Sequence, residues 1–287
     1  MKRVSRSWAF IRQVITGFVA DDCVWMAAAI SFFALLSLFP LFLLAASAIG
    51  FFLGSSEDAF GQIVTAVKRF FPRATARDIE RLLLPLVEKK TIAGGLGLLF
   101  LGWVAFALFE AVVRAINAIW GQAKIRSFLH RQLGAFLIML GSGTLLLLAF
   151  GISWFALLLQ AIDLALAERL PFRITPLWDL LLLFVPMLLT IGMFTFIYLV
   201  ASARSVPFKE ALIGGLAAGV LWQITKLAFN WYILHFADWY ANIYGLLGGL
   251  IALLLWIFYT SLLLLLGAEI VKVRLLVRPQ LEEEVKP

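Results

Sequence analysis

A single lysine lies inside one of the long apolar segments, and two amide side chains share its side of that segment. Gln223, Lys226 and Asn230 are spaced i, i+3 and i+7, so a helix places them in one stripe. An ionised amine near the centre of a membrane-spanning helix costs about 2.5 to 3.5 kcal/mol on insertion scales, so we expect the stripe to face the interior of a helix bundle. The stripe is therefore a candidate path for an anionic substrate.

Lys226 also allows a purely structural interpretation. Its long stem could stretch toward a membrane interface, or the amine could stay neutral in an apolar setting. We expect no carboxylate at comparable depth in another segment, which leaves water, backbone carbonyls or a bound anion as its partners. The ligand hypothesis and the structural one both remain open on the sequence alone.

A second group of polar residues stands at the ends of apolar segments, where we expect all of them near the cytoplasmic face. They form either a charged gate or a polar collar. Charges at helix ends are common, and Glu110 with Arg114 is an ordinary i, i+4 pair, so the collar is favoured. The group consists of Asp21, Asp22, Glu110, Arg114, Asn117 and Glu269.

Residue types that carry enzyme chemistry are scarce. The two histidines, His130 and His235, fall in different loops that we expect on opposite faces, and Cys23 is the only cysteine. These residues build neither a metal site nor a Ser-His-Asp set, and no phosphate-binding glycine loop is present. A nuclease would need clustered carboxylates or histidines and an aqueous groove. We expect no enzyme, no cofactor, no bound metal and no nucleic-acid partner.

The elements that carry these residues are membrane-spanning helices. Of 287 residues, 63% are hydrophobic and 14% are charged, whereas about 25% are charged in ordinary soluble domains. Five long intervals contain no charge, and a sixth contains only Lys226. We therefore predict one all-α integral membrane domain over residues 1–287, a bundle of six transmembrane helices at about 27–53, 92–112, 133–159, 178–201, 211–235 and 245–270.

The distribution of basic residues predicts the orientation. With six spans both termini lie on one side, and that side would hold fourteen Lys and Arg against nine on the other. This bias favours cytoplasmic termini in a cytoplasmic membrane, and it favours anionic lipids as partners. The first apolar run is too long for a cleavable signal, so we expect it to remain as a helix.

Two amphipathic regions flank the spans. Residues 8–19 place Trp8, Ile11, Ile15 and Phe18 at helical spacing with Arg12 on another side, which indicates a helix lying in the membrane interface. The first extracytoplasmic loop, residues 54–92, is predicted to contain amphipathic helices as well.

Two pairs of glycines have the spacing that lets helix backbones approach closely. They are Gly215 with Gly219 and Gly245 with Gly249. Packing within one chain is the favoured interpretation, and a homo-oligomer through these contacts is the alternative.

Four stretches resemble the YihY/BrkB family of bacterial inner-membrane proteins. The resemblance implies six spans and cytoplasmic termini, and the ribonuclease label that some members have carried looks like a misassignment. It implies no agreed substrate and no catalytic residues. The matching stretches are Asp22–Pro40 (DCVWMAAAISFFALLSLFP), Arg114–Gly121 (RAINAIWG), Pro207–Trp222 (PFKEALIGGLAAGVLW) and Tyr244–Glu269 (YGLLGGLIALLLWIFYTSLLLLLGAE).

Two functions of different class follow. The first is a transporter or flippase-like protein for an anionic or amphipathic solute or lipid, with its path along Gln223, Lys226 and Asn230. The second is a non-transporting scaffold or envelope-integrity protein, in which the stripe binds a structural lipid or a partner helix.

Overall fold

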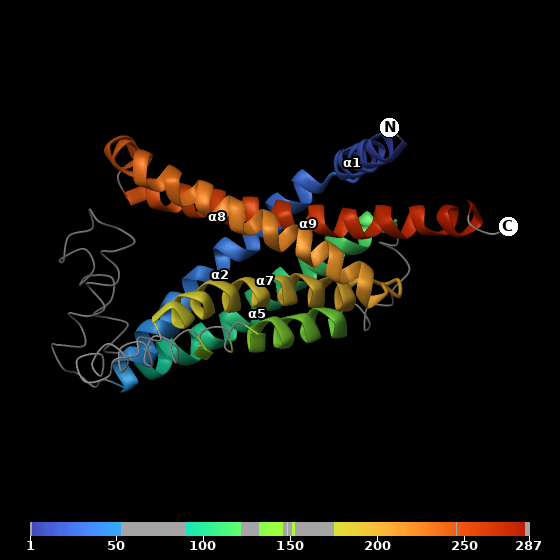
Figure 1. The fold of residues 1–287 in the computed structure, drawn as a ribbon. Helices are drawn as coiled ribbons and strands as arrows, with labels where there is room; N and C mark the ends of the chain where they lie inside the picture. The colour runs from blue at the N-terminus through green and yellow to red at the C-terminus, as the bar shows by residue number, and fades with distance from the viewer. Residues whose placement is uncertain are drawn as a thin grey trace. The chain divides into compact units, whose positions relative to one another are not determined.

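The computed structural model describes residues 2–52, 90–121, 132–145, 148, 151–152, 175–244 and 246–284. Every regular element in these ranges is a helix, as Figure 1 shows, so the all-α prediction is confirmed for them. A shorter helix covers Gln132–Leu145. The long helices are α1 (Lys2–Ala20), α2 (Cys23–Phe52), α5 (Lys90–Ile119), α7 (Thr175–Ala201), α8 (Phe208–Tyr244) and α9 (Leu246–Glu284).

Four helices in the described ranges are long and apolar enough to cross a membrane by themselves. A fifth span results if α1 and α2, which meet at a bend, are counted together. The predicted number of six spans is therefore not confirmed. The predicted span 133–159 is described only in part, and the amphipathic loop 54–92 lies almost wholly outside the described residues. The four spans are Leu99–Ile119, Phe184–Ala201, Phe208–Ile233 and Gly248–Leu276.

Large apolar side chains are exposed along these spans. Leu99, Trp103, Leu188 and Leu227 are each more than half exposed. A water-soluble protein rarely leaves so many large apolar groups on helices of this length, whereas lipid is a suitable solvent for them. The exposed surfaces therefore agree with membrane-spanning helices.

The chain divides into two compact units. The first unit contains 1–26, 109–225 and 262–287, and the second contains 27–108 and 226–261. Several helices, among them α8 and α9, contribute residues to both units.

Glycines bring α7, α8 and α9 close together in the first unit. A Cβ added to Gly214 would lie 2.9 Å from the carbonyl oxygen of Gly267, so the backbones of α8 and α9 nearly touch there. A Cβ on Gly267 would clash with the hydroxyl of Tyr198 from α7. That buried hydroxyl instead donates a hydrogen bond to the carbonyl oxygen of Leu264 at 2.9 Å. Because Gly214 in α8 and Gly267 in α9 have no side chains, there is room for the Tyr198 hydroxyl to form this hydrogen bond between α7 and α9.

One of the two predicted glycine pairs packs within the chain. A Cβ on Gly215 would lie 3.0 Å from the carbonyl oxygen of Ile191 in α7, and a Cβ on Gly219 would lie 2.5 Å from the Ile191 Cγ1. This face of α8 is therefore covered by α7. Gly249 is exposed and Gly245 lies outside the described residues, so oligomerisation through that second pair stays a prediction.

Candidate functional site

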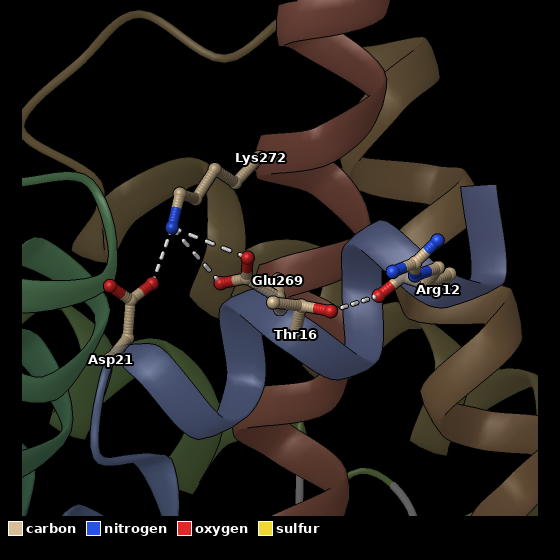
Figure 2. A network of polar contacts seen from close by, with 5 residues as sticks. All are labelled: Arg12, Thr16, Asp21, Glu269 and Lys272. Carbon is tan, nitrogen blue, oxygen red and sulfur yellow. Dashed lines mark hydrogen bonds and ion pairs between the residues drawn. The ribbon is translucent and has the colours of Figure 1, made fainter. Parts of the chain in front are cut away.

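Two carboxylates of the first unit share one ammonium, as Figure 2 shows. The Nζ of Lys272 in α9 contacts the Oδ2 of Asp21, which follows α1. The same Nζ lies 3.2 Å from the Oε1 and 3.4 Å from the Oε2 of Glu269, one turn earlier in α9. The side chain of Glu269 is only 1% exposed. A buried carboxylate of this kind needs its partner, because an uncompensated charge away from water is strongly destabilising.

The close approach of α1 to this cluster depends on a glycine. A Cβ at Gly17 would clash with the Oε1 of Glu269, so a larger residue would displace that carboxylate. Val14, one turn earlier in α1, is buried as well. The chain then turns at Asp22, whose positive φ of 53° ends α1, and whose carbonyl accepts the amides of Trp25 and Met26 at the start of α2. This turn places Asp21 beside Lys272.

A second buried carboxylate joins the start of α8 to α9. The Nε of Arg274 donates to the Oε2 of Glu210 at 2.6 Å, and the Glu210 side chain is 5% exposed. Glu210 stands in the first turn of α8, where the helix dipole favours a negative charge. The pair therefore holds the charged stretch of α9 against the beginning of α8.

Asn117 ties α5 to the end of α7. Its Nδ2 donates to the carbonyl oxygens of Val113 at 2.7 Å and Ala201 at 2.9 Å, and its Oδ1 accepts the amide of Ala203 at 2.7 Å. The bonds to Ala201 and Ala203 satisfy backbone groups at the end of α7 that have no partner within the helix. The buried amide therefore has a structural task, which is complete without a ligand.

The predicted collar residues thus separate into four environments. Asp21 and Glu269 come together, Asn117 is bound to backbone groups, and the largely buried Glu110 pairs with the exposed Arg114 at 2.7 Å. Asp22 is an exposed residue of the turn. Their role as a gate stays a prediction.

Sequence reasoning did not include Lys272, Arg274 or Glu210 among the candidate residues. The i, i+3 spacing of Glu269 and Lys272 was a usable signal for one of these contacts. The Arg274–Glu210 pair joins different helices, 64 positions apart, so no local spacing indicates it.

The stripe on α8 does not face an interior. Gln223 is half-buried, but Lys226 and Asn230 are exposed, so the expectation of a buried stripe is wrong for these two. Their surroundings on α8 are apolar and equally open: Leu227 is 68% and Trp231 58% exposed. The role of the three residues in a substrate path stays a prediction.

The depth of Lys226 in a membrane stays a prediction. Lys226 falls within the candidate span Phe208–Ile233, seven residues before its last residue, so it is slightly closer to the middle of the span than to its end.

Metal binding finds no support in the described ranges. No group of three or more His, Cys, Asp or Glu side chains within them could hold a metal ion. His235 is described, with its Nδ1 2.8 Å from the carbonyl oxygen of Trp231, whereas His130 lies outside the described residues.

Comparison with known proteins agrees with a membrane location. The UPF0761 membrane proteins of Nitrosospira multiformis and Legionella pneumophila are 31% and 29% identical over 91% of this chain, and it spans 59% and 60% of their lengths. A UPF0761 membrane protein of Cronobacter sakazakii is 31% identical over 87% of this chain and 83% of its own. No solved structure matches.

The family model for virulence factor BrkB matches residues 14–284. This range includes the cluster of Asp21, Glu269 and Lys272 as well as the whole stripe on α8. The chain therefore belongs to the virulence factor BrkB family of membrane proteins.

Proposed function

We propose that this protein is a transporter or flippase-like protein that moves an anionic, amphipathic lipid or solute across the bacterial cytoplasmic membrane. The observation that carries the proposal is the exposed position of Lys226 among apolar side chains of a membrane-spanning helix. An ammonium in this setting suits a ligand that carries an anion and a hydrocarbon chain together.

The neighbours of Lys226 favour a lipid over a fully water-soluble anion. Asn230, one turn further along α8, supplies a second polar group for a headgroup, while Leu227 and Trp231 are exposed for acyl chains. A small hydrated anion would need polar surroundings on every side. Gln223 extends the polar stripe toward the opposite face, so a headgroup could pass along one side of α8 with its chains still in the bilayer.

The orientation is part of the proposal. Fourteen Lys and Arg against nine favour cytoplasmic termini. In that arrangement the charged cluster of α1, α8 and α9 lies at the cytoplasmic face.

The test is lipid movement in vesicles. Protein reconstituted into liposomes with fluorescent phosphatidylglycerol or phosphatidylcholine is treated with a membrane-impermeant quencher, and the rate of loss of inner-leaflet signal is measured. We expect Lys226→Gln to slow phosphatidylglycerol movement about tenfold, because a charge-assisted contact contributes roughly 1.5 kcal/mol or more. Lys209→Gln, an exposed lysine at the start of α8, is the matched control and should keep the wild-type rate. Equal rates for wild type and Lys226→Gln would contradict the proposal.

A scaffold or envelope-integrity protein is the second candidate. The near contact of α8 with α9 at Gly214 and Gly267, together with the buried ion pairs, favours a rigid first unit. Wild-type protein that is folded and correctly inserted but moves none of the lipid probes would favour this candidate over transport.

A further inference from the structure

Helix α1 has three distinct faces. One face packs on the first unit, with Val14 buried and Gly17 against Glu269. A second face is apolar and open. Its residues are Trp8 at 70%, Ile11 at 48%, Ile15 at 57% and Val19 at 68% exposure.

The third face of α1 is polar. At about 100° per residue, Arg12 stands at the edge of the apolar stripe, and Thr16 and Gln13 follow it around the helix. All three side chains are exposed. A helix with protein on one side, apolar groups on the next and polar groups on the third fits a boundary where protein, lipid and water meet.

The charge of α1 identifies the chemistry of that lipid. Its sequence contains Lys2, Arg3, Arg6 and Arg12 and no acidic residue. A basic helix with an apolar face binds anionic headgroups through its charges and acyl chains through its stripe.

The attachment of α1 sets its depth. Asp21 and Gly17 contact Lys272 and Glu269, which lie within the last two turns of the candidate span that ends at Leu276. The carboxyl end of α1 is therefore held at the edge of the apolar part of α9 and cannot move far into water.

We propose that α1 lies flat in the lipid–water interface of an anionic leaflet, with Trp8, Ile11, Ile15 and Val19 among acyl chains and Arg12 on phosphate headgroups. This surface is separate from the stripe on α8, and the proposal does not depend on transport.

The test places nitroxide labels on the full chain in vesicles. Cys23, the only cysteine, is replaced by alanine, and single cysteines are introduced at exposed positions of α1. The labels Ile15→Cys and Gln13→Cys form one pair, and Ile11→Cys and Thr16→Cys form an independent second pair. Leu99→Cys on α5 is the lipid-facing reference. Accessibility to oxygen and to a water-soluble nickel reagent gives the depth of each label.

In vesicles containing phosphatidylglycerol we expect the labels at 11 and 15 to be oxygen-accessible, as at 99, about 5 to 10 Å into the headgroup and acyl boundary. The labels at 13 and 16 should be accessible to nickel. Water-like values at all four positions would overturn the proposal. Exclusion of both reagents at 11 and 15 would also overturn it, because a second copy or another protein segment would then cover the stripe.

A separate measurement tests whether α1 needs anionic lipid. In phosphatidylcholine vesicles, or with Arg12→Gln in anionic vesicles, we expect the immersed fraction of the label at 11, which lies farther from the contact at Gly17, to fall several-fold. An immersed fraction that is the same in both lipids and unaffected by Arg12→Gln would overturn the assignment of anionic lipid as the partner.

Discussion

The two units hold their polar groups in different ways. In the first unit the carboxylates of Glu269 and Glu210 are buried and bound to cations of α9. In the second unit Lys226 and Asn230 are exposed on α8 among open apolar side chains. Buried paired charges make a chain sensitive to mutation, whereas exposed ones are accessible to a ligand. We therefore expect the first set to contribute to stability, whereas the proposed function places the second set in contact with lipid.

The largest expected effect on stability is at Lys272. The substitution Lys272→Met removes the cation shared by Asp21 and Glu269 and leaves the second carboxylate buried without compensation. We expect a loss of about 3 to 5 kcal/mol in the free energy of unfolding. Unfolding by denaturing detergent in mixed micelles measures it.

A double variant checks the cause of that loss. Lys272→Met with Glu269→Gln removes the orphaned charge, so it should recover part of the stability. If the double variant is as unstable as the sum of the two single ones, the pairing described for Lys272 contributes nothing and the contrast between the units weakens.

Asn117 comes next. The substitution Asn117→Ala leaves the carbonyl of Ala201 and the amide of Ala203 without their side-chain partner. Each lost partner costs about 1 to 3 kcal/mol, so we expect a total of about 2 to 6 kcal/mol in the same unfolding measurement. A loss below that of an exposed surface substitution would show that water replaces the amide.

The third-largest effect on stability is expected at the close packing around Gly267. A methyl group there would clash with the Tyr198 hydroxyl, so Gly267→Ala should cost about 1 to 3 kcal/mol. Gly102→Ala is the matched control because its Cβ would meet no atom within 4 Å, and it should be neutral or stabilising. Equal melting temperatures for the two variants would contradict the described approach of α7 and α9.

The smallest effect is expected at Arg114. Its ion pair with Glu110 is an i, i+4 contact in which the arginine side chain is 61% and the glutamate side chain 17% exposed, so the removed cation is the exposed partner. Arg114→Gln should therefore change the free energy of unfolding by less than about 1 kcal/mol. A loss as large as that of Lys272→Met would show that burial does not separate the two kinds of ion pair.

Charge spacing and apolar length were enough to predict the helices and the sides that polar residues share. Four uncharged intervals overlap α2, α5, α7 and the apolar part of α9, the interval that contains only Lys226 overlaps α8, and Gln223, Lys226 and Asn230 lie on one helix. Periodicity states which residues share a face, but it does not state what that face contacts. For that reason the exposure of Lys226 could not be read from its spacing.

Contacts between helices were the part that sequence could not supply. The Arg274–Glu210 pair and the position of Glu269 against Gly17 depend on how α1, α8 and α9 pack. The spacing of Gly215 and Gly219 did indicate close packing, and the structure identifies α7 as the partner. Collar residues that looked alike in sequence therefore have different roles in the fold.

The most direct test compares Lys226→Gln with Lys272→Met in one set of proteoliposomes and micelles. We predict that Lys226→Gln keeps the unfolding free energy of the wild type but moves phosphatidylglycerol about tenfold more slowly. We predict that Lys272→Met loses about 3 to 5 kcal/mol of stability. A Lys226→Gln protein with unchanged lipid movement, or with a stability loss equal to that of Lys272→Met, would contradict the separation of structural from functional charge.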